Sequence, residues 1–251
     1  MRFDEKTAIV TGASEGIGFA IAAGLAAEGA RVVLVARREE LLAEAARKLG
    51  PRVSYVAGDA SLPETADRAV AAAIERYGSL DLLACNAGVL LPGPVMHQPM
   101  EQIDTMLGLN LRGPIAFVRA ATPRLAGRPG ASILLISSAT SRLPLPHLAV
   151  YGATKAALNY LTQTWAVELA SAGIRVNALS PGGTYTPAFH AVAEVVPGLE
   201  QGTIATNLIK RIATAEEVAR LGLLLLDDRE TSYVTGSIWD ADGGYQRGRF
   251  L

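Results

Sequence analysis

Short runs of apolar, often β-branched residues alternate along this chain with longer stretches in which apolar residues recur at helical spacing. Apolar runs of about four to eight residues predict buried strands, and apolar positions three and four residues apart predict amphipathic helices. The predicted strands are Thr7–Thr11, Arg31–Val35, Arg52–Val56, Leu80–Cys85, Ala131–Ser137, Ile174–Leu179 and Gly236–Trp239. The predicted helices are Ile17–Glu28, Glu39–Leu49, Glu64–Tyr77, Tyr151–Ala170 and Ala215–Leu226.

Another helical stretch runs from about Met100 to Leu125, and Gly113-Pro114 should bend it. Alternation of strands and helices predicts an α/β protein with a single Rossmann-type, doubly wound parallel sheet and helices on both faces. No linker, repeat or low-complexity segment interrupts the pattern, so we expect one domain over residues 1–251.

A glycine-rich turn follows the first strand. In doubly wound sheets ligands bind beyond the carboxyl ends of the strands. The segment Thr11-Gly-Ala-Ser-Glu-Gly-Ile-Gly18 lies there, with glycines at positions 12, 16 and 18. Glycine lets the backbone approach a pyrophosphate closely, and the following helix presents free N–H groups to the anion. A tight turn alone also uses glycine, but the position between first strand and first helix favours dinucleotide binding.

Tyr151 and Lys155 are four residues apart, which places both side chains on one face of a helix. A tyrosine with its ordinary pKa of about 10 transfers protons poorly at neutral pH, and an adjacent ammonium would lower that pKa. The pair therefore predicts a proton-transfer site. Coincidence or a surface cation–π contact would give the same spacing, so the pair alone does not decide the function.

Two further polar residues have both a functional and an ordinary interpretation. Ser138 follows the fifth strand, where its hydroxyl can bond a substrate oxygen, although serine also commonly caps or ends an element. Asn110 lies within a helical stretch, where it either binds something or is exposed and inert.

Composition narrows the possible functions. The 251 residues are 50% hydrophobic and carry a formal net charge of −1, so no global basic field attracts nucleic acid or an anionic membrane. Cys85 is the only cysteine, and the charged start of the chain leaves no room for a signal peptide, so we expect a cytoplasmic protein. The histidines, His97, His147 and His190, lack metal-ligand spacing, and we expect no metal.

Taken together, these residues resemble the pattern of the short-chain dehydrogenase/reductase family from about Lys6 to about Gly244. The matching set is Thr11-Gly-x-x-x-Gly-x-Gly18, Asp59, Asn86-Ala-Gly88, Asn110, Ser138, Tyr151-x-x-x-Lys155 and Pro181-Gly182. Each motif alone is weak, but their order along the predicted elements makes the resemblance specific. It implies an NAD(P)-dependent enzyme that interconverts a ketone and a secondary alcohol by hydride transfer.

The resemblance also implies a role for each matching residue. Tyr151 would be the general acid in reduction and the base in oxidation, and Lys155 would lower its pKa and bind the nicotinamide ribose. Ser138 would orient the carbonyl oxygen, Asn110 would hold a water linked to Lys155, and Asp59 would face adenine. The implied cofactor-binding residues are Gly12, Ser14, Gly16, Ile17, Gly18, Arg37, Asp59, Ala60, Asn86, Gly88, Tyr151, Lys155, Pro181, Gly182 and Thr184. The family forms dimers or tetramers through helices equivalent to Met100–Leu125 and Tyr151–Ala170, so we expect a homo-oligomer.

The residues after the second strand bear on the choice of cofactor. Rossmann-type sites that prefer NAD place a carboxylate there for the ribose 2′-hydroxyl. Here Ala36 occupies that position and Arg37-Arg38 follows, which suits a 2′-phosphate through charge-assisted hydrogen bonds. Glu15 in the glycine turn argues the other way, because its carboxylate would repel the phosphate. We expect NADP(H) to be favoured over NAD(H).

The expected substrate is a medium-sized, apolar small molecule with a carbonyl or alcohol group. A loop from Thr184 to about Asn207 should cover it. His147 is either a second polar contact for the substrate or a partly exposed loop residue. The apolar residues expected around the substrate are Leu90, Leu91, Leu143, Leu145, Phe189, Val192, Val195, Val196 and Ile204.

Two alternatives stay open. The family includes 3-oxoacyl-[acyl-carrier-protein] reductases, which commonly have an arginine near the end of the Tyr–Lys helix. Ala172 occupies the position where we expect that arginine, which counts against this substrate. The other alternative is a catalytically silent NAD(P)-binding sensor, although such relatives usually lose the Tyr–Lys pair that this chain keeps.

Overall fold

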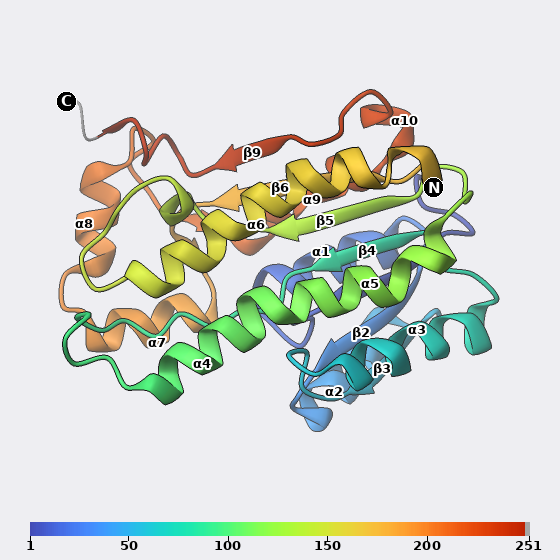
Figure 1. Cartoon of the computed structure of the whole chain (residues 1–251), viewed down its shortest axis with the longest axis horizontal. Coiled ribbons are helices and arrows are strands. Elements are labelled where there is room, and N and C mark those ends of the chain that lie inside the picture. The colour runs from blue at the N-terminus through green and yellow to red at the C-terminus, as the bar shows by residue number, and fades with distance from the viewer. Residues whose placement is uncertain (249–251) are drawn as a thin grey trace.

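The computed structural model describes residues 1–248 (Figure 1). The main sheet contains β1 (Thr7–Thr11), β2 (Arg31–Ala36), β3 (Val53–Ala57), β4 (Leu82–Cys85), β5 (Ser132–Ile136), β6 (Arg175–Pro181) and β9 (Ile238–Ala241). The helices are α1 (Gly16–Ala27), α2 (Glu39–Leu49), α3 (Pro63–Tyr77), α4 (Met100–Leu107), α5 (Gly113–Leu125), α6 (Ala149–Glu168), α7 (Pro187–Val195), α8 (Leu199–Thr206), α9 (Ala215–Leu226) and α10 (Asp228–Thr231). Short segments are η1 (Gly108–Arg112), η2 (Ala139–Ser141), η3 (Ala170–Ala172), β7 (Thr184–Tyr185) and β8 (Ala213–Thr214). The last three residues of the domain predicted over 1–251 lie outside the described residues.

The strands and helices predicted from periodicity are present, and their ends lie within two residues of the expected positions. Helix α2 shows the local reasons. Glu39 and Glu40 lie in its first turn and Arg47 and Lys48 in its last turn, so both ends complement the helix dipole. Gly50 follows with φ +98°, a conformation that glycine adopts without strain, and the helix ends there.

The seven strands of the main sheet lie in the order β3-β2-β1-β4-β5-β6-β9, and every pair is parallel. The predicted doubly wound α/β fold is therefore confirmed. The chain moves outward from β1 to β3 and then returns to the other side of β1 with β4. This reversal of strand order between β1 and β4 places a crevice at their carboxyl ends, where ligands bind in folds of this kind.

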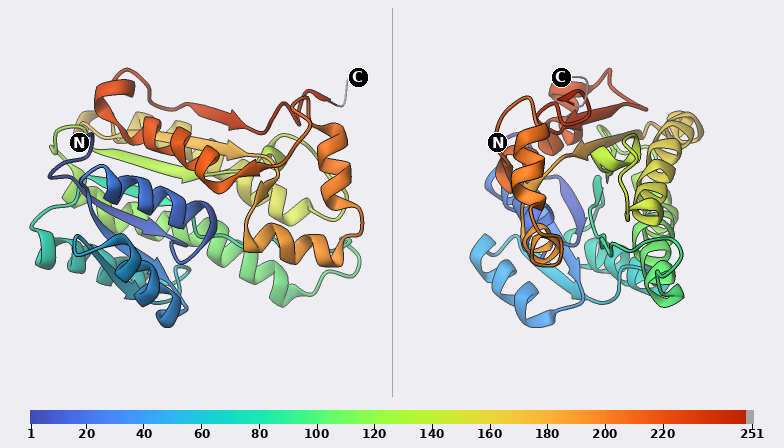
Figure 2. Two further views of the ribbon diagram at one scale, coloured as in Figure 1. Left: turned by 180° about the vertical axis from the view of Figure 1, so that it is seen from behind. Right: turned by 90° about the vertical axis from the view of Figure 1, so that its left-hand side faces the viewer.

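Helices cover both faces of the sheet. One face packs against α1, α2 and α9, and the other against α3, α5 and α6 (Figures 1 and 2). Strand β1 divides its side chains between them: Ala8 and Val10 belong to the first core, and Ile9 belongs to the second. All five residues of β1 are buried, as expected for a central strand of a two-sided parallel sheet.

The segment predicted as a covering loop from Thr184 to Asn207 is mostly helical, so that prediction was wrong in detail. Helices α7 and α8 lie at the carboxyl end of the sheet (Figure 1). Thr186 caps α7 by accepting a hydrogen bond from the Phe189 N–H at 3.1 Å, and Pro187 begins the helix. Gly198, with φ +77°, separates the two helices. This cap and proline were signals that the sequence interpretation overlooked.

The helical stretch from Met100 to Leu125 is irregular at a different place from the one predicted. Gly113-Pro114 opens α5, and the irregularity is a single π-helical segment, η1, directly before it. Pro114 has no N–H to donate to a carbonyl of the preceding turn, which favours an altered hydrogen-bond pattern there. Gly113 is needed for a close approach, because a Cβ at this position would lie 2.5 Å from the carbonyl oxygen of Ala60.

Candidate active site

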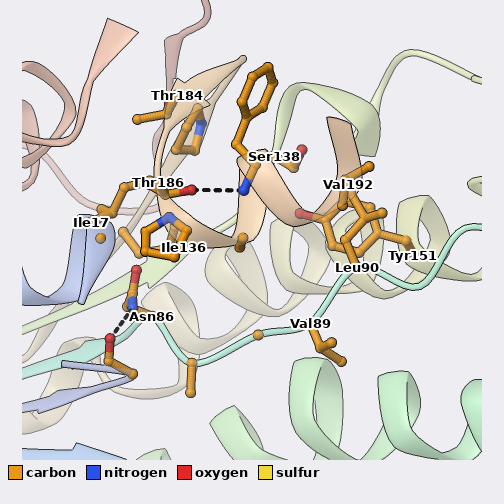
Figure 3. Close-up of a pocket in the computed structure, with 18 of the residues that line it drawn as sticks. Ile17, Asn86, Val89, Leu90, Ile136, Ser138, Tyr151, Thr184, Thr186 and Val192 are labelled. Atoms are coloured by element: carbon orange, nitrogen blue, oxygen red, sulfur yellow. Dashed lines mark hydrogen bonds between the residues drawn. The ribbon is translucent and has the colours of Figure 1, made fainter. Parts of the chain in front are cut away.

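A cavity of about 430 Å³ opens at the carboxyl edge of the sheet, next to α7 and α8 (Figure 3). Most of the residues predicted to form the site line it, namely Gly12, Ser14, Gly16, Ile17, Arg37, Ala60, Asn86, Gly88, Ser138, Tyr151, Lys155, Pro181, Gly182 and Thr184. Three predicted residues, Gly18, Asp59 and Asn110, are not part of its lining. The fold therefore brings together residues from turns that are far apart in the sequence.

The glycine turn fits a bound dinucleotide. Gly12 and Gly16 have φ values of +64° and +61°, which side chains rarely adopt. A Cβ at Gly12 would lie 2.7 Å from the Nδ2 of Asn86. Glu15 occupies the N-cap of α1 but makes no side-chain capping hydrogen bond, so its side chain leaves the N–H groups of the first turn free for an anion.

Gly18 supports this turn from behind. A Cβ at Gly18 would lie 2.3 Å from the carbonyl oxygen of Gly12, so only glycine allows α1 to pack this closely. The Asn86 side chain donates to the carbonyl oxygens of Thr11 and Gly12, at 3.1 Å each. Asn86 therefore fastens the end of β4 to the glycine turn as well as lining the cavity.

Asp59 lies beside the cavity rather than in its wall. Its carboxylate accepts a hydrogen bond from the backbone N–H of Ser61 at 2.8 Å and so closes the turn between β3 and α3. The neighbouring Ala60 is the residue of this turn that lines the cavity. The contact between Asp59 and adenine that the resemblance implies stays a prediction.

One end of the cavity lies between the turns that follow β1 and β2. Ala36, Arg37 and Arg38 line it together with Glu15. Arg38 forms an ion pair with Glu15, with 2.6 Å between Nη2 and Oε1. Arg37 is exposed, and no ion pair or hydrogen bond involves its side chain within residues 1–248. This end therefore presents an unpaired guanidinium beside a neutralised carboxylate.

Tyr151 and Lys155 share one face of α6, as their spacing predicts. The Nζ of Lys155 lies 5.8 Å from the centre of the Tyr151 ring and donates to the carbonyl oxygen of Ile136 at 2.8 Å. Lys155 is only 4% exposed, and burial lowers its pKa to about 8. Ser138, at the end of β5, faces the same cavity (Figure 3).

The Tyr151 pKa differs from the value that the Tyr–Lys pair led us to expect. Burial raises this pKa, and a hydrogen bond with Ser138 offsets the rise only in part. Burial of the phenol therefore dominates, and the lowering predicted from Lys155 is not found. The Lys155 ammonium lies over the Tyr151 ring, 5.8 Å from its centre, and is itself buried.

Asn110 lies in the π-helical segment η1 and is completely buried. Its Oδ1 accepts from the N–H of Val89, and its Nδ2 donates to the carbonyl of Val89, at 2.8 Å each. Nδ2 also donates to the Thr154 hydroxyl at 3.3 Å. A Cβ at Gly88 would lie 3.3 Å from the Asn110 Oδ1 and 3.4 Å from the Lys155 Nζ, so Gly88 lies between these polar groups. Asn110 is thus neither exposed nor inert, since it supports the wall behind Lys155.

The end of the cavity nearest Tyr151 is apolar. Four of the residues expected around the substrate line it: Leu90, Leu145, Phe189 and Val192 (Figure 3 labels two of them). The other five, Leu91, Leu143, Val195, Val196 and Ile204, are not in the lining. Among the lining residues that the sequence interpretation missed are Val89, Thr140, Leu148, Leu199, Thr203 and Tyr245. Helical spacing within α8 could have indicated Leu199 and Thr203, whereas no local signal marks Tyr245.

His147 is exposed and does not line the cavity. It has a φ of +67°, and its carbonyl oxygen accepts a hydrogen bond from Gly93 N–H at 2.9 Å. The geometry therefore favours the interpretation of His147 as an exposed loop residue, which joins two loops at the rim through its backbone.

Within residues 1–248, no group of three or more His, Cys, Asp or Glu side chains is arranged to hold a metal ion. In the same residues, no helix combines the length and apolar character needed to cross a membrane.

Comparison with known proteins gives a consistent result. The family model described as "Enoyl-(Acyl carrier protein) reductase" matches residues 12–246. "Oxidoreductase asL5" of Sarocladium schorii is 37% identical over 246 residues, which cover 97% of this chain and 96% of that protein. "Dehydrogenase/reductase SDR family member 4" of Bos taurus is 36% identical, with 96% of this chain and 87% of that protein covered. A solved structure of a short chain dehydrogenase/reductase family protein has a TM-score of 0.86 and 35% identity, covering 98% of this chain and 99% of that one.

The fold and the cavity are those of a nucleotide-dependent oxidoreductase. The chain belongs to the short-chain dehydrogenase/reductase family, and it is an NAD(P)-dependent dehydrogenase or reductase.

Proposed function

We propose that this enzyme reduces a medium-sized, uncharged, apolar ketone to a secondary alcohol, with NADPH as the preferred cofactor. The proposed substrate class rests on the apolar wall of the cavity near Tyr151, where the polar groups are a few hydroxyls. The charged side chains in the cavity lining are Glu15, Arg37, Arg38 and Lys155. A buried charge without a partner is costly, so an apolar wall of this kind selects against ionised substrates.

Each residue near the reacting atoms has a role in this proposal. The bound nicotinamide supplies the hydride. Tyr151 donates its hydroxyl proton to the carbonyl oxygen during reduction, and the Ser138 hydroxyl orients that oxygen. The raised pKa of Tyr151 keeps the hydroxyl protonated at neutral pH, which suits an acid. Lys155 holds the nicotinamide ribose, and Asn110 holds the polar wall behind the lysine.

The remaining cofactor contacts in this proposal are those that the family resemblance implies, and the cavity lining supports them. Gly12, Gly16 and the first turn of α1 bind the pyrophosphate through backbone N–H groups. Arg37 binds the 2′-phosphate of NADPH through a charge-assisted hydrogen bond. Pro181-Gly182 and Thr184, which line the cavity at the end of β6, border the nicotinamide.

A panel of ketones in matched pairs tests the substrate class. Each pair has one member with a terminal methyl and one with a terminal carboxylate, and NADPH consumption gives kcat/KM. We expect the uncharged member to react at least about tenfold faster, because the carboxylate would lose hydration without gaining a partner. Equal rates across the pairs would overturn the proposal that the site selects uncharged, apolar substrates.

Two variants of α7 sharpen that test. Val192→Lys introduces a cation into the apolar wall and should reduce the discrimination against carboxylates. Val195→Lys on the same helix is the matched control, because Val195 is 67% exposed and outside the lining. An equal effect of both variants would show that the charge acts on the enzyme in general rather than on the bound substrate.

The second candidate is reduction of a 3-oxoacyl group on acyl carrier protein. The description of the matching family model also names acyl carrier protein, but with an enoyl group, whose C=C bond is reduced instead of a carbonyl. The test presents the same 3-oxoacyl group on carrier protein and on a small thiol. A strong preference for the carrier form would favour this candidate over a free ketone. Tight NADPH binding with no turnover of any carbonyl would instead favour a sensor.

We also propose that the chain is a single domain that forms a homodimer or homotetramer through α4–α5 and α6, as the family resemblance implies. Exposed apolar side chains on these helices support this, namely Leu107, Ile115, Tyr160 and Val167. Light scattering coupled to size-exclusion chromatography measures the oligomeric state. A monomer at micromolar concentration would overturn the proposed homodimer or homotetramer.

A further inference from the structure

Ser138 is held by a neighbour that the family motif does not include. It is the N-cap residue of η2, the short turn that follows β5. Its Oγ accepts a hydrogen bond from the backbone N–H of Thr140 at 3.2 Å. The same Oγ accepts a second hydrogen bond from the Thr140 hydroxyl, at 2.9 Å. Thr140 therefore contacts Ser138 twice, once through its backbone and once through its side chain.

These two contacts restrict what the Ser138 hydroxyl can do. A serine hydroxyl has one proton to donate and two lone pairs that accept. When both lone pairs accept hydrogen bonds from Thr140, only the O–H remains, and it is directed away from η2. Ser138 lines the cavity with Tyr151, so its hydroxyl proton is available to an oxygen bound there.

The turn that carries Thr140 is itself firmly placed. It packs against the start of α6, where a Cβ at Gly152 would lie only 3.1 Å from the carbonyl oxygen of Thr140. Gly152 is the neighbour of Tyr151 in the sequence. The close approach at Gly152 therefore fixes the distance between the turn and the tyrosine, and Thr140 itself lines the cavity.

We propose that Thr140 is a positioning residue, whose hydroxyl keeps Ser138 as a hydrogen-bond donor into the cavity, toward the Tyr151 oxygen in the free enzyme and toward the substrate oxygen once a substrate is bound. The inference rests on the proposed function in assigning the reacting oxygen to this place. Without the Thr140 hydroxyl, one lone pair of Ser138 is free, and the serine can rotate and accept a hydrogen bond from Tyr151. That reversed hydrogen bond holds the tyrosine proton and leaves the phenolate without a donor.

The direction of the Tyr151 pKa effect agrees with this arrangement. The Ser138 hydrogen bond lowers the Tyr151 pKa, against the larger effect of burial. A group that donates to an oxygen stabilises its ionised form, whereas a group that accepts from it stabilises the protonated form. The direction of the smaller, Ser138 effect is thus the one expected when Ser138 is the donor, although burial keeps the Tyr151 pKa raised.

The test compares Thr140→Val with Thr140→Ser. Valine keeps the branched shape and removes the hydroxyl, and serine restores the hydroxyl. Thr122→Val is the matched control, because the Thr122 hydroxyl donates only to Val118 in its own helix and lies outside the cavity lining. Ultraviolet titration of tyrosinate, with the Tyr151→Phe form of each variant subtracted, reports the Tyr151 pKa without any need for turnover.

We expect the Tyr151 pKa to rise by about 0.4 to 1 unit in Thr140→Val, the equivalent of one ordinary hydrogen bond. Thr140→Ser and the control should match the parent protein. If Thr140→Val titrates as the parent does, the inference is overturned, whatever substrate the enzyme takes. Should valine disturb the turn, Thr140→Ala provides the same comparison.

The kinetics of alcohol oxidation give a second, separate readout. The substrate is the secondary alcohol that corresponds to one of the ketones that the parent enzyme reduces. The rate of its oxidation rises with pH as the Tyr151 phenolate forms, and this rising part of the pH–rate profile should move to higher pH in Thr140→Val. At neutral pH kcat should fall by about 2- to 10-fold. A uniform loss of rate at every pH, with no movement of the rising part of the profile, would indicate a merely structural role. Failure of the proposed function is a different result, since then no alcohol is oxidised by the parent enzyme.

Discussion

Glu15 and Arg38 form an ion pair at the nucleotide end of the cavity, with 2.6 Å between the Arg38 Nη2 and the Glu15 Oε1. Glu15 directly precedes α1 and Arg38 directly precedes α2, so the pair joins the turns that follow β1 and β2. From the sequence alone, Glu15 argued against NADPH because a carboxylate repels a phosphate. In the structure Arg38 neutralises that carboxylate, while Arg37 lines the cavity.

Arg37→Ala should reduce the preference for NADPH over NADH by about tenfold, because the guanidinium is the group that a 2′-phosphate would contact. The ratio of kcat/KM for the two cofactors measures it. Arg47→Ala is the control, since Arg47 is an exposed arginine in the last turn of α2, at the far end from the cavity. An unchanged ratio in Arg37→Ala, or equal use of both cofactors by the parent enzyme, would contradict the assignment of Arg37.

Tyr151→Phe should lower turnover by about 10²- to 10⁴-fold, the usual contribution of a positioned general acid. NADPH affinity should change little, because the ring that packs in the cavity is kept. Stopped-assay turnover and cofactor titration by fluorescence measure the two quantities. Tyr160→Phe is the matched control on the same helix, where Tyr160 is 70% exposed. Comparable turnover of Tyr151→Phe and Tyr160→Phe would remove Tyr151 from the mechanism.

Most of the fold could be predicted from the sequence, because the signals that specify it are local. Buried parallel strands read as short apolar runs, and the helices between them carry clear periodicity, as α2 does with its charged ends. The covering segment was misjudged because its helices are short and interrupted at Gly198. Its N-terminal cap, Thr186-Pro187, was a usable signal.

The site was predictable only where a motif marks the residue. Tyr151, Lys155 and the glycine turn have fixed spacings, so the sequence places them together. Tyr245 reaches the cavity from the end of the chain, and its position depends on how the segment after β9 folds. The direction in which the Tyr151 pKa shifts depends mainly on burial, which is a property of the packed structure and not of residue spacing.

The pH dependence of kcat/KM for NADPH should report the ionisation of Lys155. Burial lowers its pKa to about 8, so the ammonium is mostly present below that pH and is lost as the pH rises through it. If the ammonium binds the ribose, kcat/KM for NADPH falls as the pH rises through about 8. In Lys155→Arg the guanidinium stays charged, and the fall at this pH should disappear even if the overall rate is lower. A flat profile from one unit below to one unit above this pH in the parent enzyme would contradict the prediction.

Asp81 holds the opposite edge of the sheet, at the amino ends of the strands. It is 1% exposed, and its Oδ2 accepts hydrogen bonds from the Thr7 N–H at 2.9 Å and the Ser79 hydroxyl at 3.1 Å. Its Oδ1 accepts from two nitrogens of Arg128, at 2.9 and 2.7 Å. One carboxylate thus joins β1, the start of β4 and the loop before β5.

Asp81→Asn should lower the free energy of unfolding by about 2 to 4 kcal/mol, because it removes the charge that pairs with Arg128 and replaces an acceptor by a donor beside the Ser79 hydroxyl. For a chain of this size each kcal/mol corresponds to about 2 to 4 °C in Tm, which thermal unfolding followed by circular dichroism measures. The kcat of the folded enzyme should stay unchanged, since Asp81 lies at the edge away from the cavity. Asp67→Asn, an exposed position on α3, serves as the control. Equal stability of these two variants would show that the buried network around Asp81 contributes little to the fold.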